Sequence, residues 1–142
     1  MSTLSPNYNR PKNPSPCILV LDDDPDIREI YVEALEQGGY QVDAAADGQA
    51  GWEALQAHEY DLLITDYEMP GLSGLEVVKN LHSSGMSLAV IVASGSLSIE
   101  ELKRQLPTQT AIALSKPFSP SELLKTVDRV LCGNNVSVHA IA

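Results

Sequence analysis

Four short runs of apolar residues most constrain the fold of this 142-residue chain. They cover residues 17–21, 62–65, 88–93 and 111–114. Each run is too short for a typical helix and too continuously apolar for a strand with one face in water. Such runs are typical of a parallel sheet whose two faces are both covered. A weaker fifth strand is predicted at residues 41–45.

Helix-length amphipathic segments separate these runs and follow the last of them. Asp24-Pro25 provides an N-cap residue followed by a proline at the first helical position, and Ser98 and Ser119 each stand three residues before a glutamate. The predicted helices cover residues 25–37, 49–57, 75–83, 99–106 and 120–131. Regular alternation of strand and helix predicts an α/β domain, a doubly wound five-stranded parallel sheet with helices on both faces.

The chain divides into one domain and two tails. Residues 1–16 contain four prolines separated mainly by polar residues, which predicts an extended, disordered tail. The α/β domain is predicted over residues 17–132, and residues 133–142 form a short C-terminal tail. No output module is recognisable in the chain.

Charge and composition exclude several functions. The formal net charge of −10 opposes direct binding to nucleic acid. No apolar run approaches the roughly 18 residues of a membrane helix, and the first residues lack the apolar centre of a signal peptide. We therefore expect a cytoplasmic protein without membrane contact. Cys17 and Cys132 lack metal-ligand spacing and are expected to be reduced structural thiols.

Acidic residues follow two of the predicted strands. Asp22 and Asp23 come directly after the first apolar run, and Asp66 follows the third strand. Ligands of open parallel sheets bind beyond the carboxyl ends of the strands, and neighbouring strands lie only about 5 Å apart. Clustered carboxylates repel one another, and a hard divalent cation relieves that repulsion. One or two carboxylates with water suit Mg²⁺.

Two further residues complete this edge of the predicted sheet. Ser94 follows the fourth strand and precedes Gly95, while Lys116 follows the fifth strand and precedes Pro117. A hydroxyl, a lysine and a metal around one carboxylate are the groups that phosphoryl transfer to an aspartate requires. The residue after Ser94, a glycine, leaves room for a phosphoryl group.

Four segments together resemble the receiver domain of two-component response regulators. They read LVLDDDPDIRE, LLITDYEMPGLSG, VIVASG and LSKPF, and the resemblance extends over residues 17–131. Each segment alone is weak, but the combination is highly specific. The resemblance implies a flavodoxin-like fold with the strand order 2-1-3-4-5.

The resemblance also implies roles for the acidic residues. Asp66 is similar to the phosphoacceptor, and Asp22 and Asp23 to the acid pair that holds Mg²⁺. The backbone carbonyl of Glu68 corresponds to a further metal ligand. Asp24 has two open roles, service to the metal through a water molecule or the cap of the first helix, and we favour the cap.

The same resemblance assigns Ser94 to the hydroxyl switch position and Lys116 to the phosphate-binding lysine. The family usually has a cis peptide bond at this Lys-Pro pair, here Lys116-Pro117. Glu68 and Ser96 stand where family members tune the lifetime of the phosphoryl group. Ala113 departs from the family, which commonly has an aromatic residue three positions before the lysine. We therefore expect signalling through loop movement around residues 94–98 and backbone repacking.

A receiver of this kind accepts a phosphoryl group from a histidine kinase or histidine phosphotransfer protein. It catalyses only its own phosphorylation and dephosphorylation, so it is not an enzyme in the ordinary sense. The resemblance predicts a stand-alone receiver that acts by phosphorylation-dependent binding to an unidentified downstream protein. A phosphorelay intermediate and a phosphate sink remain open as alternatives.

Two other interpretations of the acidic run are weaker. Residues 22–24 contain the D-x-D pattern of haloacid-dehalogenase-type phosphatases, but such enzymes need more chain and later acidic motifs. A calcium loop beginning at Asp22 would have Glu33 at its twelfth position, but Ile27 occupies the sixth, where the turn needs glycine.

Overall fold

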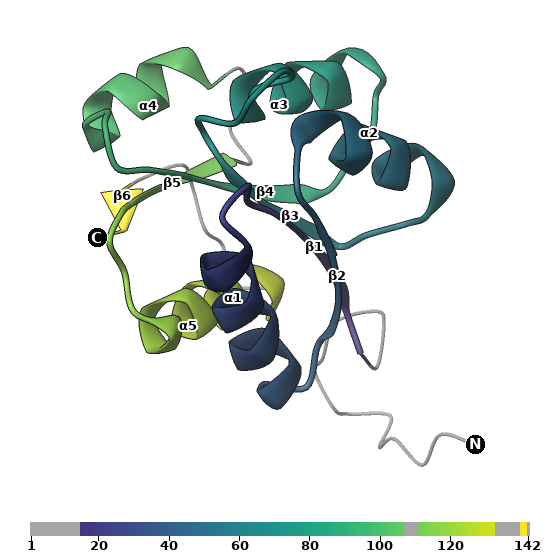
Figure 1. Ribbon diagram of the computed structural model, residues 1–142, viewed down its shortest axis with the longest axis vertical. Coiled ribbons are helices and arrows are strands. Elements are labelled where there is room, and N and C mark those ends of the chain that lie inside the picture. The colour runs from purple at the N-terminus through teal and green to yellow at the C-terminus, as the bar shows by residue number, and fades with distance from the viewer. Residues whose placement is uncertain (1–14, 107–110, 133–139, 142) are drawn as a thin grey trace.

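The computed structural model describes residues 15–106, 111–132 and 140–141 (Figure 1). Strands and helices alternate along the chain. The strands are β1 (Cys17–Leu21), β2 (Gln41–Ala45), β3 (Leu62–Asp66), β4 (Ala89–Ser94), β5 (Ala111–Ser115) and β6 (Ala140–Ile141). The helices are α1 (Pro25–Gln37), α2 (Gly48–Ala57), α3 (Gly74–Ser83), α4 (Ile99–Gln105) and α5 (Pro120–Leu131).

All strands of the sheet run parallel, in the order β2-β1-β3-β4-β5-β6. The predicted doubly wound α/β fold and its five-strand order 2-1-3-4-5 are therefore confirmed. The sheet differs from the prediction at one edge. Ala140 and Ile141, which the sequence assigned to a tail, pair with Ala113 and Leu114 of β5 as a sixth strand.

Alternate residues of the strands face opposite sides of the sheet, and each side has its own apolar core. One core packs Ile18 and Val20 of β1 against α1 and α5, and the other packs Leu19 and Leu21 against α2, α3 and α4. Figure 1 shows the two helix layers on either side of the sheet. Burial on both faces explains why these strands are apolar along their whole length.

The helices begin where their capping residues stand. Asp24 accepts hydrogen bonds from the backbone N–H groups of Asp26 and Ile27 at the start of α1. Capping boxes start α3, α4 and α5, with Ser73, Ser98 and Ser119 as their N-cap residues. The capping roles predicted for Asp24, Ser98 and Ser119 are confirmed, and the box at Ser73 was not predicted.

Differences from the predicted bounds are small and fall at element ends. α2 and α3 each begin one residue earlier than predicted, at glycines that carry no periodic signal. β3, β4 and β5 each extend one residue further, to Asp66, Ser94 and Ser115, so these polar residues belong to the ladder itself. The tail predicted at residues 1–16 lies almost wholly outside the described residues.

Two further features of the described residues bear on the other predictions. Within the described residues, no helix is long and apolar enough to cross a bilayer. Cys17 and Cys132 are both free thiols, although Cys132 is exposed rather than surrounded by apolar side chains.

Candidate functional site

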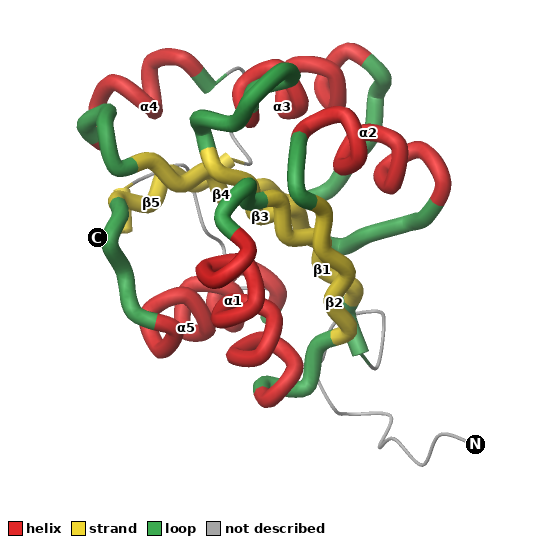
Figure 2. The backbone as a smooth tube through the Cα atoms, viewed as in Figure 1, coloured by secondary structure: helices red, strands yellow, loops and turns green. Residues whose placement is uncertain are grey.

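The carboxyl ends of β1, β3, β4 and β5 meet at one edge of the sheet, where loops lead on to the helices (Figure 2). Strand register brings the relevant residues together. Leu21 of β1 pairs with Thr65 of β3, so Asp22 and Asp66 follow at the same level. Asp66 in turn pairs with Ala93, and Ser94 pairs with Ser115.

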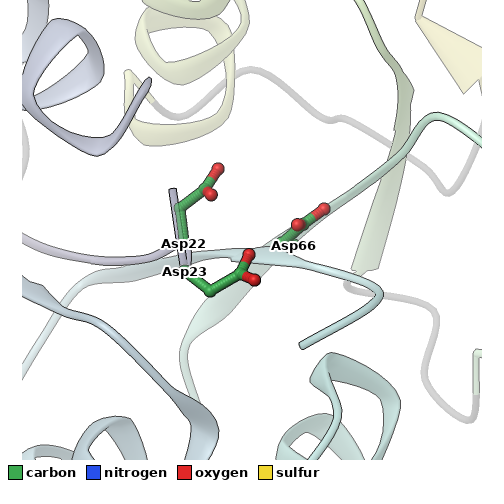
Figure 3. Close-up of side chains that lie close together, drawn as sticks. All are labelled: Asp22, Asp23 and Asp66. Carbon is green, nitrogen blue, oxygen red and sulfur yellow. The ribbon is translucent and has the colours of Figure 1, made fainter. Parts of the chain in front are cut away.

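Three carboxylates gather at this edge. Asp22, Asp23 and Asp66 each offer an oxygen atom, and these oxygens lie within 4.8 Å of one another (Figure 3). Asp22 is only 2% exposed, Asp66 is partly buried and Asp23 is exposed. Hard oxygen donors at this separation, some of them open to water, fit the coordination that Mg²⁺ prefers. The residues present therefore match a divalent cation site.

The three successive aspartates after β1 have different environments. The Asp22 carboxylate accepts a hydrogen bond from the Asp24 backbone N–H at 2.9 Å, which fixes the turn. Asp23 points its carboxylate toward the cluster with Asp66. Asp24 turns away to cap α1. The strand thus delivers two of its three following acids to the cluster and uses the third to start a helix.

Lys116 supplies the positive charge at the cluster. Its Nζ lies 3.1 Å from Asp66 Oδ1 and 3.4 Å from Asp22 Oδ2, and the lysine side chain is 20% exposed. The backbone N–H of Lys116 donates to the Ser94 carbonyl, which ties the lysine to the end of β4. The Lys116-Pro117 peptide bond is cis, as the sequence predicted.

Burial and charge set the ionisation of the ion pair. Burial raises the pKa of Asp66 above its ordinary value; Lys116 opposes this increase, and repulsion from Asp22 and Asp23 adds to it. Burial alone would lower the pKa of Lys116, but attraction from Asp66 and Asp22 outweighs it and raises that pKa. The lysine is therefore held in its charged form beside a carboxylate whose negative charge is disfavoured.

Ser94 lies at the end of β4 and is 1% exposed. Its hydroxyl oxygen accepts hydrogen bonds from the backbone N–H groups of Ser96 and Leu97, both at 3.1 Å. The hydroxyl therefore holds the loop between β4 and α4 in a tight turn. A Cβ at Gly95 would lie 3.6 Å from the Lys116 Cβ, which is an ordinary van der Waals contact, so packing alone does not require a glycine here.

A polar contact joins the two loops that border the cluster. The Ser96 hydroxyl donates a hydrogen bond to the Glu68 carboxylate, and its oxygen lies 3.4 Å from the Ser94 hydroxyl. Glu68 and Ser96 are far apart in sequence, so only the fold brings them together. The pair spans from the loop after β3 to the loop after β4.

Gly74 allows α3 to start directly against the phosphoacceptor candidate. A Cβ at this position would lie 2.1 Å from the Asp66 carbonyl oxygen, which is far inside van der Waals contact. The Gly74 N–H donates to the Tyr67 carbonyl at 3.0 Å. A side chain here would push the helix away from the loop that carries Asp66.

The structure brings together the side chains of four predicted site residues, Asp22, Asp23, Asp66 and Lys116. Ser94 stands at the end of the neighbouring strand, and Ala113 is fully buried in the core below α4. His58 and His82 are exposed near helix ends, and His139 lies outside the described residues.

Sequence reasoning missed two residues that contact the site. Arg28 Nη1 donates a 2.7 Å hydrogen bond to the Asp22 carbonyl, which holds the acidic loop against α1. Tyr67 extends from the position after Asp66 to Gln105 of α4. The spacing and periodicity of the sequence predict neither contact, because each depends on where the end of a long side chain lies in the folded chain.

The charges and positions of these side chains indicate the kind of reaction that the site can support. Asp66 offers a carboxylate oxygen next to an ammonium group, and its neighbours supply oxygen ligands for a cation. A carboxylate in these surroundings can act as a nucleophile toward a group whose negative charge the lysine stabilises. Phosphoryl groups meet that description.

Comparisons of the sequence with known proteins agree with this chemistry. A family model described as the response regulator receiver domain matches residues 18–128. The chain is 37% identical over 114 residues to the response regulator MprA of Mycobacterium ulcerans, a match covering 80% of this chain and 49% of MprA. It is 31% identical to the response regulator receiver protein CpdR of Brucella abortus, of which it covers 95%. The chain thus spans about half the length of MprA but nearly all of CpdR.

Solved structures give the same result. The Vibrio cholerae chemotaxis protein CheY4 superposes with a TM-score of 0.74 at 31% identity, covering 82% of this chain and 99% of CheY4. The response regulator TrrA of Thermotoga maritima, solved in complex with Mg(2+)-BeF, superposes with a TM-score of 0.72 at 33% identity over 82% of this chain and 99% of TrrA. With sequence, strand order and structural neighbours in agreement, this chain belongs to the family of response regulator receiver domains.

Proposed function

We propose that this chain accepts a phosphoryl group on Asp66 in a Mg²⁺-dependent reaction and signals through the protein surfaces that respond to it. The observation that carries the proposal is the ion pair of Lys116 Nζ with Asp66 Oδ1 at 3.1 Å, next to two further carboxylates. Residues 17–132 form the unit that carries out this chemistry.

In this proposal an Asp66 carboxylate oxygen attacks the phosphorus of a phosphohistidine. The new bond joins Asp66 oxygen to phosphorus, the nitrogen–phosphorus bond breaks, and the histidine leaves with the bonding pair. Lys116 pairs with the phosphoryl oxygens as negative charge builds there, and its raised pKa keeps it protonated. Ser94 supplies a hydroxyl that can donate to the same oxygens after transfer.

Mg²⁺ would be held by Asp22, Asp23, Asp66 and the backbone carbonyl of Glu68, where it would supply positive charge against the phosphoryl oxygens. Two observations support this assignment. The three carboxylates repel one another, which already contributes to the raised pKa of Asp66. TrrA, a relative of known structure, was solved in complex with Mg(2+)-BeF.

The donor in this proposal is a histidine kinase or a histidine phosphotransfer protein, and the acceptor of the signal is a downstream protein. CpdR, of which the chain covers 95%, supports a receiver that works without a second domain. A cytoplasmic location belongs to the same proposal, and the free thiols of Cys17 and Cys132 are compatible with it.

The test is intact-mass analysis after incubation with acetyl phosphate and Mg²⁺. Wild-type protein should gain one phosphoryl adduct, and Asp66→Ala should gain none because the nucleophile is gone. Asp26→Ala is the matched control, since it removes an exposed aspartate near the site and should leave the adduct unchanged. Wild type without an adduct, although Mg²⁺ binds, would exclude the proposed chemistry.

The fate of the phosphoryl group distinguishes the roles that remain open. If the chain is a phosphorelay intermediate, adding a histidine phosphotransfer protein to the phosphorylated chain should transfer the phosphoryl group to a histidine. Rapid release of the phosphoryl group as inorganic phosphate would favour a phosphate sink. Steady hydrolysis of a phosphate monoester, with many turnovers per chain, would instead indicate a haloacid-dehalogenase-type phosphatase.

A further inference from the structure

Tyr67, the residue that follows Asp66, makes a hydrogen bond to helix α4. Its backbone N–H donates to the carbonyl of Ala93 on β4 at 2.7 Å, which fixes the start of the loop after β3. Its hydroxyl donates to the Oε1 atom of Gln105, the last residue of α4, also at 2.7 Å. One residue thus spans from the phosphoacceptor candidate to a helix 38 positions away in the sequence.

Helix α4 is short and packs against the core through Leu102 and the partly buried Ile99. It has seven residues, Ile99–Gln105, and Leu102 is its buried residue. Leu102 belongs to the same apolar core as Ala113 of β5, and the ring of Tyr67 packs against that core. Ala113 has no side chain long enough to act on α4 from β5. Tyr67 therefore supplies both apolar contact with this core and a polar bond to α4, whereas Ala113 offers the core only a methyl group.

The other end of α4 is held by Ser94. Its hydroxyl oxygen accepts hydrogen bonds from the N–H groups of Ser96 and Leu97, in the loop that leads into the helix. If the Ser94 side chain rotated about χ1 to donate to a phosphoryl oxygen on Asp66, its oxygen would move away from these two N–H groups, and the loop would lose both bonds. A short helix moves as one piece, so Gln105 would shift with it. A hydrogen bond is lost once its heavy atoms separate beyond about 3.5 Å.

We propose that the Tyr67–Gln105 hydrogen bond is a latch that holds α4 in its resting position and opens when Asp66 is phosphorylated. This inference rests on the function proposed above, because that function provides the event that opens the latch. Tyr67 is a positioning residue: it does not touch the phosphoryl group and acts through the placement of α4.

The latch has a definite thermodynamic consequence. A contact made in one state and not in the other shifts the equilibrium toward the state that makes it. Removing the hydroxyl should therefore favour the switched position of α4 even without phosphorylation. The Tyr67–Gln105 bond is exposed to water, so its net contribution lies at the low end for hydrogen bonds and corresponds to a change of about twofold to threefold in the ratio of the two states.

The experiment follows the backbone amide resonances of Glu101 and Leu102 in α4, which neither variant replaces, by NMR with and without beryllofluoride and Mg²⁺ as a phosphoryl mimic. Tyr67→Phe removes the hydroxyl and keeps the ring, and Gln105→Leu removes the acceptor from the exposed side of α4. Tyr60→Phe is the matched control, because its hydroxyl donates to Asp43, away from α4. Intact-mass analysis with acetyl phosphate accompanies each variant.

The latch predicts that α4 resonances of both latch variants lie, before any mimic is added, part of the way along the line from resting to mimic-bound wild type. The Tyr60→Phe control should coincide with resting wild type. Latch variants that coincide with resting wild type, or that lose the response to the mimic, would overturn the proposal. If Tyr67→Phe fails to fold, Gln105→Leu carries the test. Wild type that neither gains an adduct nor responds to the mimic would instead contradict the proposed function.

Discussion

At the scale of single residues, the Asp66–Lys116 pair determines how the site responds to pH. The carboxylate is partly buried, and burial raises the pKa of Asp66 despite the nearby ammonium group. A carboxyl group whose pKa is raised on folding favours the folded state fully at pH values below its unfolded pKa. That contribution is lost as the pH rises through the folded pKa. The ionised form of Asp66 therefore reduces the free energy of unfolding near neutral pH.

Asp66→Asn should accordingly be more stable than wild type at pH 7 in the presence of EDTA, and the difference should close as the pH falls below the unfolded pKa of the aspartate. Thermal unfolding at a series of pH values measures it. Lys116 keeps Asp22 as a partner at 3.4 Å in the variant, so the lysine is not left without an acidic neighbour. Asp26→Asn, an exposed aspartate, serves as the control. A stability difference that does not change with pH would show that ionisation of Asp66 is not its cause.

At the scale of helices and strands, the loop after β1 separates the carboxylates of the proposed metal site from the residue that caps α1. Asp22 and Asp23 belong to the carboxylate cluster, whereas Asp24 accepts hydrogen bonds from the N–H groups of Asp26 and Ile27. Proline at the first position of α1 needs no hydrogen-bond acceptor, so the cap serves the donors that follow it. If these roles are independent, a substitution in the loop can change the capping of α1 without changing metal affinity, or the reverse.

Asp24→Ala should reduce the free energy of unfolding by about 1 kcal/mol, because it removes the side-chain acceptor at the start of α1. Asp24→Asn keeps an acceptor and should stay close to wild type. Both should retain Mg²⁺ affinity within a small factor, whereas Asp23→Ala should weaken it clearly. Chemical denaturation gives the stability, and calorimetric titration gives the affinity. Equal loss of Mg²⁺ binding in Asp24→Ala and Asp23→Ala would assign Asp24 to the metal site as well.

At the scale of the whole molecule, acidic residues outnumber basic ones by 19 to 9, which gives the net charge of −10. Much of this charge lies on the surface, but the cluster at the edge of the sheet is partly buried and less screened by salt. A divalent cation bound there stabilises the folded chain, because the unfolded chain does not hold the three carboxylates together.

Mg²⁺ should therefore raise the melting temperature, and EDTA should reverse the increase. At a concentration 100 times the dissociation constant, binding adds about 2.7 kcal/mol to the free energy of unfolding. Calorimetry in Mg²⁺, compared with KCl at equal ionic strength, measures the specific part. Asp23→Asn is the matched variant and should respond less than wild type. An equal increase in KCl would mean that general screening, and not a site, stabilises the fold.

The sequence was sufficient for the order of the first five strands and the five helices, and for the positions that the fold brings together beside Asp66. Continuous apolar runs identified a sheet buried on both faces, and capping residues gave the starts of α1, α4 and α5. Asp66 and Ser94 end their strands, Asp22, Asp23 and Lys116 follow theirs, and parallel strands bring such positions to one edge. These inferences depend on local patterns and on one rule of sheet topology, so they need no knowledge of side-chain contacts.

Only the tertiary structure decided the contacts made by the ends of long side chains. The bond from Tyr67 to Gln105, the bond from Arg28 to the Asp22 carbonyl and the Ser96–Glu68 pair each join residues whose spacing carries no periodicity. The sixth strand likewise pairs two residues that have no strand pattern of their own. Periodicity reports which face of an element is buried, but a hydrogen bond between two elements depends on their separation and relative placement, which packing alone fixes.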